Sequence, residues 1–167
     1  MPLNQIKKYN SLLDIAGLSI REREISLKAV FKRDVADNTS FKFRAKQIQP
    51  TPKEGQLNLD ILYAHLTTVV TDKKTRKREY DIHRSKRLHW LKHHLEEKQK
   101  EGMLVFSAKD KDGIRTYIYD ATEYYVIVLE PLRKVDAYYL LSAYHLRGRD
   151  KEKIAKKYKR RRLPDLY

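Results

Sequence analysis

Residues 103–146, MLVFSAKDKDGIRTYIYDATEYYVIVLEPLRKVDAYYLLSAYHL, decide the fold of this chain. The stretch contains four runs rich in β-branched and aromatic residues, at 103–108, 114–120, 124–130 and 137–146. Short polar turns separate these runs. Because loops this short join antiparallel neighbours, the stretch predicts a four-stranded antiparallel β-meander.

A helix is predicted immediately before these strands. Asp81 suits the N-cap position, and Gly102 is expected to end the helix. One face of this helix carries leucines at helical spacing, namely Leu88, Leu91 and Leu95. The spacing therefore predicts that this leucine face packs on the strands.

The flanking segments carry weaker patterns. Residues 3–16 predict a short helix, and the leucine spacing of 59–70 predicts another. Alternating apolar residues in 24–33 and 41–45 predict a β-hairpin. A last helix is expected over 150–163, rich in lysine and arginine, with Pro164 as its stop.

Together these elements predict an α+β fold. In it a helix packs on the four-stranded meander, preceded by an N-terminal helix and a β-hairpin-plus-helix region, and followed by a basic C-terminal helix. The expected organisation is an N-terminal α/β region at 1–72 that is integral to the module, a core at 73–163 and a tail at 164–167.

The positive charge of the chain is confined to two segments. The 167 residues contain 37 Lys+Arg and 22 Asp+Glu, a formal net charge of +15. Residues 73–100 contribute +7 and residues 147–162 contribute +8, so the remainder sums to zero. Such clusters attract polyanions and favour nucleic acid as a partner, whereas an isolated charge run is more often a solvated helix face.

Missing residue types exclude several classes of function. The chain has no cysteine, which excludes disulfide frameworks, thiol catalysis and thiolate-bound metals, and favours the reducing cytoplasm. It shows no nucleotide-binding glycine loop, and no export signal or membrane span is expected. His89 and His93 have a spacing that can hold zinc, but without HExxH or cysteine no metal site and no cofactor are expected.

The helix after Asp81 concentrates candidate functional side chains. Arg84 falls on its leucine face, where it forms an internal salt bridge, snorkels, or points a fixed fork at a phosphate. Arg87 can bind phosphate, His89 can move a proton and Trp90 can stack on a base, although Trp90 can equally fill a core. These residues predict a nucleic-acid-binding face.

The last strand adds a second set of candidates. Ser142 and Tyr144 share one of its faces, and His145 lies on the other. We take Arg84, Arg87, His89, Ser142, Tyr144 and His145 as candidate catalytic residues. Candidate nucleic-acid contacts are Lys86, Trp90, Arg115, Tyr117, Lys156, Lys157, Arg160 and Arg161.

Four segments resemble a known group of nucleases. They are YDIHRSKRLHW at 80–90, RTYIY at 115–119, YVIVLEP at 125–131 and YLLSAYHL at 139–146, ahead of a basic tail. They are similar to the phage- and plasmid-borne branch, the PBECR-type domains, of the barnase, EndoU, colicin and RelE-like nuclease fold. The resemblance covers about residues 73–163, and Ser142 stands where that pattern leads us to expect threonine.

The resemblance implies a toxin-like or host-acting ribonuclease carried on mobile elements. Arg84 and Arg87 would bind phosphate, His89 or His145 would transfer protons, and Ser142 and Tyr144 would line the cleft. The expected reaction is metal-independent general acid–base transesterification of RNA to a 2′,3′-cyclic phosphate. A cognate antitoxin or immunity protein is a possible further partner in this family.

Two other interpretations stay open. The chain could be a non-catalytic nucleic-acid-binding accessory protein of a phage or conjugative element, or a protein-interaction module with a basic tail. A shared cleft that brings Arg84 and His145 within reach of one phosphate favours catalysis, whereas separation of the two by the sheet favours binding alone. The sequence sets no oligomeric state.

Overall fold

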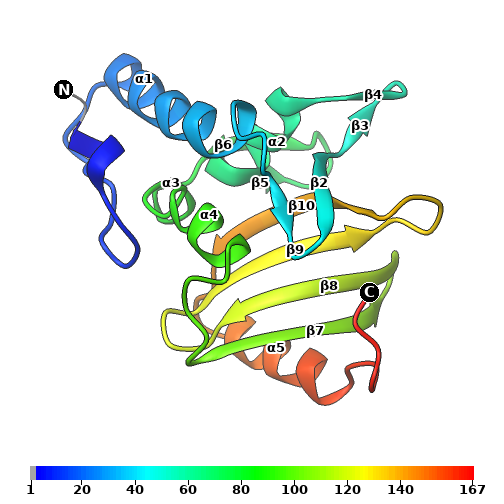
Figure 1. The fold of residues 1–167 in the computed structure, drawn as a ribbon. Helices are drawn as coiled ribbons and strands as arrows, with labels where there is room; N and C mark the ends of the chain where they lie inside the picture. Colours follow the sequence, from blue (N-terminus) through cyan, green and yellow to red (C-terminus); the bar gives the residue numbers. More distant parts are fainter. Residues whose placement is uncertain (1–2) are drawn as a thin grey trace.

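A six-stranded mixed sheet forms the centre of the α+β fold (Figure 1). The computed structural model describes residues 3–167. The strand order is β1-β2-β10-β9-β8-β7. The last four strands are present where the sequence predicted them and pair antiparallel in chain order: β7 (Met103–Asp110), β8 (Gly113–Asp120), β9 (Tyr125–Pro131) and β10 (Ala137–His145).

The sheet is larger than the expected four strands because an N-terminal hairpin joins it. This hairpin consists of β1 (Lys42–Phe43) and β2 (Lys46–Pro50), and β2 pairs parallel with β10. The parallel pairing covers only Ala137–Leu140 of β10, and a bulge follows between Leu140 and Ser142. Residues 141–145 therefore have a strand neighbour on one side only, within the part of the chain that the structure describes.

The prediction of a strand over 24–33 was wrong, because this segment lies in helix α1 (Ile20–Phe31). Ser19 and Glu22 form a reciprocal capping box, in which the Glu22 amide donates to Ser19 Oγ and Glu22 Oε2 accepts from the Ser19 amide at 2.9 Å. The buried apolar residues are Leu27, Val30 and Phe31, at helical spacing. A π-helical turn, η2 (Lys32–Ala36), continues the helix.

Other N-terminal elements differ from the prediction in extent. In place of a helix over 3–16 there is one 3-10 turn, η1 (Leu3–Ile6). The helix expected over 59–70 ends earlier, as α2 (Leu59–Thr67), because the chain then enters strand β5. Two small hairpins lie outside the main sheet: β3 (Pro52–Lys53) with β4 (Gln56–Leu57), and β5 (Thr68–Asp72) with β6 (Lys77–Tyr80).

The helix expected after Asp81 is split in two. Asp81 is the predicted N-cap and accepts from the Arg84 amide at 2.8 Å. Tight i→i+3 hydrogen bonds through 84–91 then separate α3 (Ile82–Ser85) from α4 (Trp90–Leu95). The expected leucine face is buried, but the helix ends before Gly102, whose positive φ instead turns the chain into β7.

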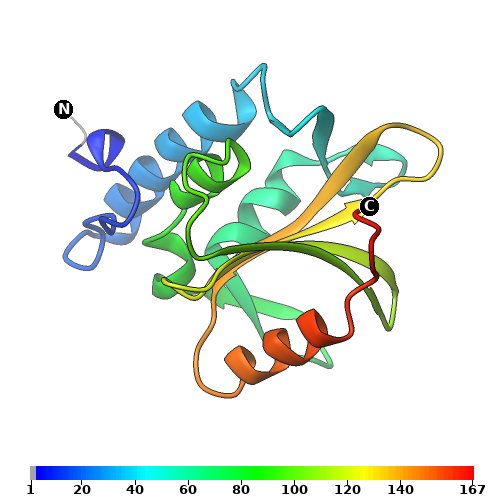
Figure 2. The ribbon, with the colours of Figure 1, turned by 60° about the horizontal axis from the view of Figure 1, so that its bottom comes forward.

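Helices cover the two faces of the sheet unequally (Figure 2). The core on one face joins α1, α2 and α4 to sheet residues such as Ile118, Ile127 and Leu140. On the other face α5 (Asp150–Lys159) packs through Ile154 against Phe106 and its neighbours. Across 3–167, no helix has the length and apolar character needed to cross a bilayer.

Candidate functional site

Arg84 occupies a half-buried position beside residues 141–145 of β10, the part of this strand that has a strand neighbour on one side only. Its Nη1 donates to the carbonyl oxygen of His65 at 2.8 Å and to Ser142 Oγ at 3.1 Å. Its guanidinium carbon lies 4.9 Å from the centre of the Tyr144 ring. We call His65, Arg84, Ser142 and Tyr144 the Arg84 site.

The charge of Arg84 has no carboxylate partner within 4.0 Å among residues 3–167. Burial lowers the pKa of its guanidinium, and Asp81 opposes this effect from a distance. The internal salt bridge that the sequence left open for Arg84 is therefore not formed. A half-buried cation held by neutral acceptors is costly unless an anion can approach it, so the site is suited to bind a phosphate.

Local structure positions the other three residues of the Arg84 site. Helix α2 packs along β10 and brings His65 to its unpaired edge, while the bulge after Leu140 sets the direction of Ser142. His65 Nδ1 lies 3.1 Å from the Leu141 carbonyl oxygen. Because a carbonyl only accepts, Nδ1 carries the proton and Nε2 is left with a free lone pair.

The surroundings of His65 favour its neutral form, which is the form that can accept a proton. Burial lowers the pKa of the imidazole, and the nearby Arg78, Arg84 and Arg76 lower it further. The ring is therefore neutral at pH 7. Sequence reasoning missed His65, although a histidine on a helix that later packs against the candidate strand was visible in the sequence.

Tyr144 faces the opposite side of the sheet from the leucine-rich core. Burial raises the pKa of its phenol, so the group stays protonated at neutral pH. Behind it, Lys157 Nζ donates to Asp110 Oδ2 at 2.6 Å, and the Tyr117 hydroxyl donates to the same oxygen at 2.9 Å. This network attaches helix α5 to the sheet beside the Arg84 site.

His145 belongs to a different cluster. It alternates with Tyr144 along β10, so it points to the other face of the strand. Burial, followed by the charges of Arg87 and His83, lowers its pKa to about 4. Arg87 Nη1 donates to the His83 carbonyl at 2.8 Å, and its guanidinium lies over the Trp90 ring. The structure thus groups Arg84 with Ser142 and Tyr144, and Arg87 with His145.

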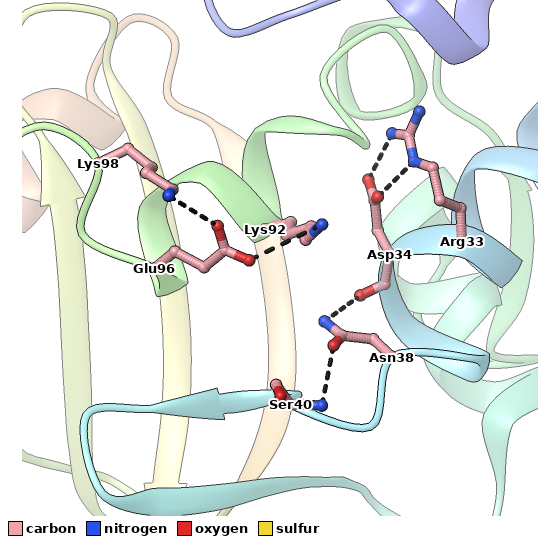
Figure 3. Close-up of polar contacts among 7 residues, drawn as sticks. All are labelled: Arg33, Asp34, Asn38, Ser40, Lys92, Glu96 and Lys98. Carbon is pink, nitrogen blue, oxygen red and sulfur yellow. Dashed lines mark hydrogen bonds and ion pairs between the residues drawn. The ribbon is translucent and has the colours of Figure 1, made fainter.

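His89 lies away from both groups, contrary to the expectation that it joins the site. The residue is 5% exposed, and Nε2 lies 3.3 Å from the Lys8 carbonyl oxygen. It lines a cavity of about 870 Å³ between the N-terminal segment, η2 and α4. Figure 3 shows the charged side chains of this region, where Arg33 forks onto Asp34 and Glu96 lies between Lys92 and Lys98.

Trp90 does not present its ring to a base. It is 1% exposed, and its Nε1 donates to the Ser11 carbonyl at 3.0 Å. The 3-10 turn before α4 changes the angular position that a continuous helix would give it. Of the two interpretations of Trp90, the core residue is therefore correct.

The remaining candidate nucleic-acid contacts are dispersed. Tyr117 is buried, and Lys157 is paired with Asp110. Arg115 lies 3.4 Å from Glu130, beside another cavity of about 870 Å³. Lys86 is half-buried, Arg161 stacks on Tyr158, and Lys156 and Arg160 are exposed. Among these candidates within residues 3–167, Lys156 on α5 and Arg160 directly after it are exposed and have no carboxylate partner.

Comparison of the chain with protein-family models, curated proteins and solved structures finds no significant match. The residues themselves therefore carry the functional argument. Within residues 3–167, no three His, Asp or Glu side chains gather as a potential metal site.

Proposed function

We propose that this protein is a metal-independent endoribonuclease that binds the scissile phosphate at Arg84. The observation that carries the proposal is the half-buried guanidinium without a carboxylate partner, next to a neutral histidine whose tautomer is fixed. The fold that we propose is the barnase, EndoU, colicin and RelE-like arrangement of a helix packed on a four-stranded meander, as the sequence resemblance implies.

The proposed reaction uses His65 as the base. Nε2 of His65 takes the proton of the ribose 2′-OH, and O2′ forms a bond to phosphorus. The P–O5′ bond breaks, and O5′ takes a proton from water. The products are a 2′,3′-cyclic phosphate and a 5′-hydroxyl end.

Arg84 has the electrostatic role in this reaction. Its fork can bind two phosphate oxygens and stabilise the additional negative charge of the transition state. Ser142 Oγ and the Tyr144 ring hold the guanidinium in place before substrate arrives, so little reorganisation is needed. His145, the base expected from the sequence, is less suitable because a pKa of about 4 makes its nitrogen a weak proton acceptor.

The biological setting follows from the resemblance alone. We propose a toxin-like or host-acting enzyme of a phage or plasmid, active in the cytoplasm and controlled by an antitoxin or immunity protein. The absence of cysteine from the chain is compatible with a reducing compartment.

A second candidate function is RNA binding without cleavage. It is favoured by one observation: Arg84 contacts Ser142 and Tyr144, whereas His145 points to the other face of β10, so the two residues first expected to act together are separated. In this case Arg84 would hold a phosphate only to dock the protein on RNA.

Incubation of the purified protein with total RNA in EDTA separates the two functions. The wild type is compared with His65→Ala, Arg84→Met and the distant control Arg133→Ala, and the fragment ends are analysed. Cyclic-phosphate ends from the wild type and the control, but not from the first two variants, support the nuclease. Intact RNA with salt-sensitive binding supports the second function.

A further inference from the structure

The β5–β6 hairpin connects the two helices that carry the Arg84 site. β5 begins directly after α2, which holds His65, and β6 ends one residue before Asp81, the cap of the helix that holds Arg84. The base of the hairpin is fixed, because the Asp81 amide and Ser85 Oγ both donate to the Thr67 carbonyl, at 2.9 and 3.1 Å. Both ends of the hairpin are thus fixed next to the helices that hold His65 and Arg84.

The hairpin is a separate ribbon with a cationic turn. It forms its own two-stranded sheet, apart from the main sheet, and residues 71–77 are exposed. Its turn carries Lys73, Lys74 and Arg76, none of which has a carboxylate within 4.0 Å in the described chain. The two acidic residues of the hairpin are already engaged.

These two acidic residues have structural roles. Asp72 Oδ1 accepts from the Lys74 amide at 2.8 Å and shapes the turn, while Glu79 pairs with Lys77 at 3.2 Å. Arg78 folds back, and its Nε donates to Thr68 Oγ1 at 2.8 Å. The turn therefore keeps three free cations, while the base of the hairpin is neutralised or hydrogen-bonded.

Lysine on an exposed ribbon edge also prevents unwanted strand pairing, which is the simplest alternative explanation. Prevention of strand pairing requires charges along the exposed edges of the hairpin. It does not require that these charges lie near a functional site. Here the cations are concentrated at the turn, and Arg78 and Arg76 already act on the pKa of His65. The field of the hairpin thus extends to the Arg84 site.

We propose that the β5–β6 hairpin is an arm that holds the RNA backbone away from the cleavage point and makes the protein prefer longer strands. A five-residue strand spans about 17 Å, a distance on the order of five nucleotides of a stacked strand. The turn then contacts phosphates that a very short RNA does not have. This inference rests on the proposed function of the Arg84 site.

The test compares two triple variants that remove the same charge. Lys73→Ala/Lys74→Ala/Arg76→Ala alters the arm, and Lys53→Ala/Arg133→Ala/Lys134→Ala alters exposed residues outside it. Binding is measured by fluorescence anisotropy with a 15-nucleotide RNA carrying 2′-O-methyl groups, which block cleavage, and by competition with a four-nucleotide RNA.

We expect the arm variant to bind the 15-nucleotide RNA about tenfold more weakly. Its log–log salt dependence should be shallower by about 2, as expected for three lost phosphate contacts. Affinity for the four-nucleotide RNA should fall by no more than about twofold, because Arg76 is the one residue of the three whose charge acts on His65 at the Arg84 site. The control variant should match the wild type. Equal behaviour of the two triple variants, or an equal loss with both RNA lengths, overturns the proposal.

Cleavage of the unmethylated RNA distinguishes failure of the arm from failure of the nuclease. If the arm gives length-dependent binding but the wild type does not cleave RNA, the proposed nuclease activity is refuted and the role of the arm is supported. If cleavage is lost in Arg84→Met and both triple variants bind RNA identically, the nuclease activity is supported and the role of the arm is refuted. If the wild type binds no RNA, both proposals are refuted.

Discussion

Replacement of Arg84 by methionine should abolish function while leaving stability nearly unchanged. Methionine keeps an unbranched side chain but removes the charge. Two hydrogen bonds are lost, to the His65 carbonyl and Ser142 Oγ, each worth about 1.5–3 kcal/mol for a charged donor. The His65 carbonyl keeps one donor, because Ser142 Oγ also lies 3.4 Å from it.

The opposing effect is of similar size. A half-buried cation without a carboxylate partner carries a desolvation penalty of several kcal/mol, which the apolar side chain does not have. The two contributions should nearly cancel, so we expect the free energy of unfolding of Arg84→Met to stay within about 1.5 kcal/mol of the wild type. RNA cleavage should fall at least about 100-fold, as when one oxyanion donor is removed.

Urea unfolding followed by Trp90 fluorescence measures the stability, and cleavage of a defined RNA in EDTA measures the activity. Arg84→Lys serves as the control, because it keeps a charge but loses the planar fork, and it should remain impaired. A loss of more than about 3 kcal/mol in Arg84→Met, with residual activity that follows the folded fraction, would show that Arg84 is structural and refute this reasoning.

Three further outcomes are expected. Ser19→Ala removes the cap of α1 and should lower the unfolding free energy by about 1 kcal/mol in urea titrations, and no change would argue against the capping box. Because the pKa of His145 is about 4 in the folded chain and near 6.5 when unfolded, its contribution is present above pH 6.5 and is lost as the pH falls toward 4. His145→Gln should therefore flatten thermal stability against pH across this range, and an unchanged slope contradicts the assignment. Trp90→Ala should cost about 3–5 kcal/mol by calorimetry, and a cost below about 1 kcal/mol would be incompatible with a core position.

The strands of the C-terminal half could be predicted because their signals are local. Each run alternates or is wholly apolar, and each turn is too short for anything but an antiparallel neighbour. The same applies to Asp81, whose capping role depends on a residue three positions later. The predictions succeeded where neighbouring residues contained the necessary information.

Helix α1 was mispredicted because two periods overlap in it. Ile25, Leu27, Ala29 and Phe31 alternate like a strand, while Leu27, Val30 and Phe31 follow the helical period. Ile25 is 61% exposed, so the alternating set does not define a buried face. The Ser19 and Glu22 pair, three positions apart, was the local signal that distinguishes the two.

The candidate site could be predicted only in part. Arg84 and Ser142 are 58 positions apart and meet because α3 packs on β10, a contact that the leucine spacing of the following residues did not specify. His65 was missed because its role depends on a hydrogen bond to Leu141, 76 positions away, at an edge that exists only once β2 has stopped pairing. No pattern around His65 encodes that edge.

The parallel pairing of β2 with β10 also affects how the protein folds. The two strands lie about ninety positions apart, and β10 is the last strand to leave the ribosome. Until β10 has been made, the β1–β2 hairpin has no strand that links it to the rest of the sheet, so this part of the sheet cannot form during most of the synthesis. For a protein with the proposed activity, this late closure would delay the assembly of the Arg84 site until nearly the whole chain has been made.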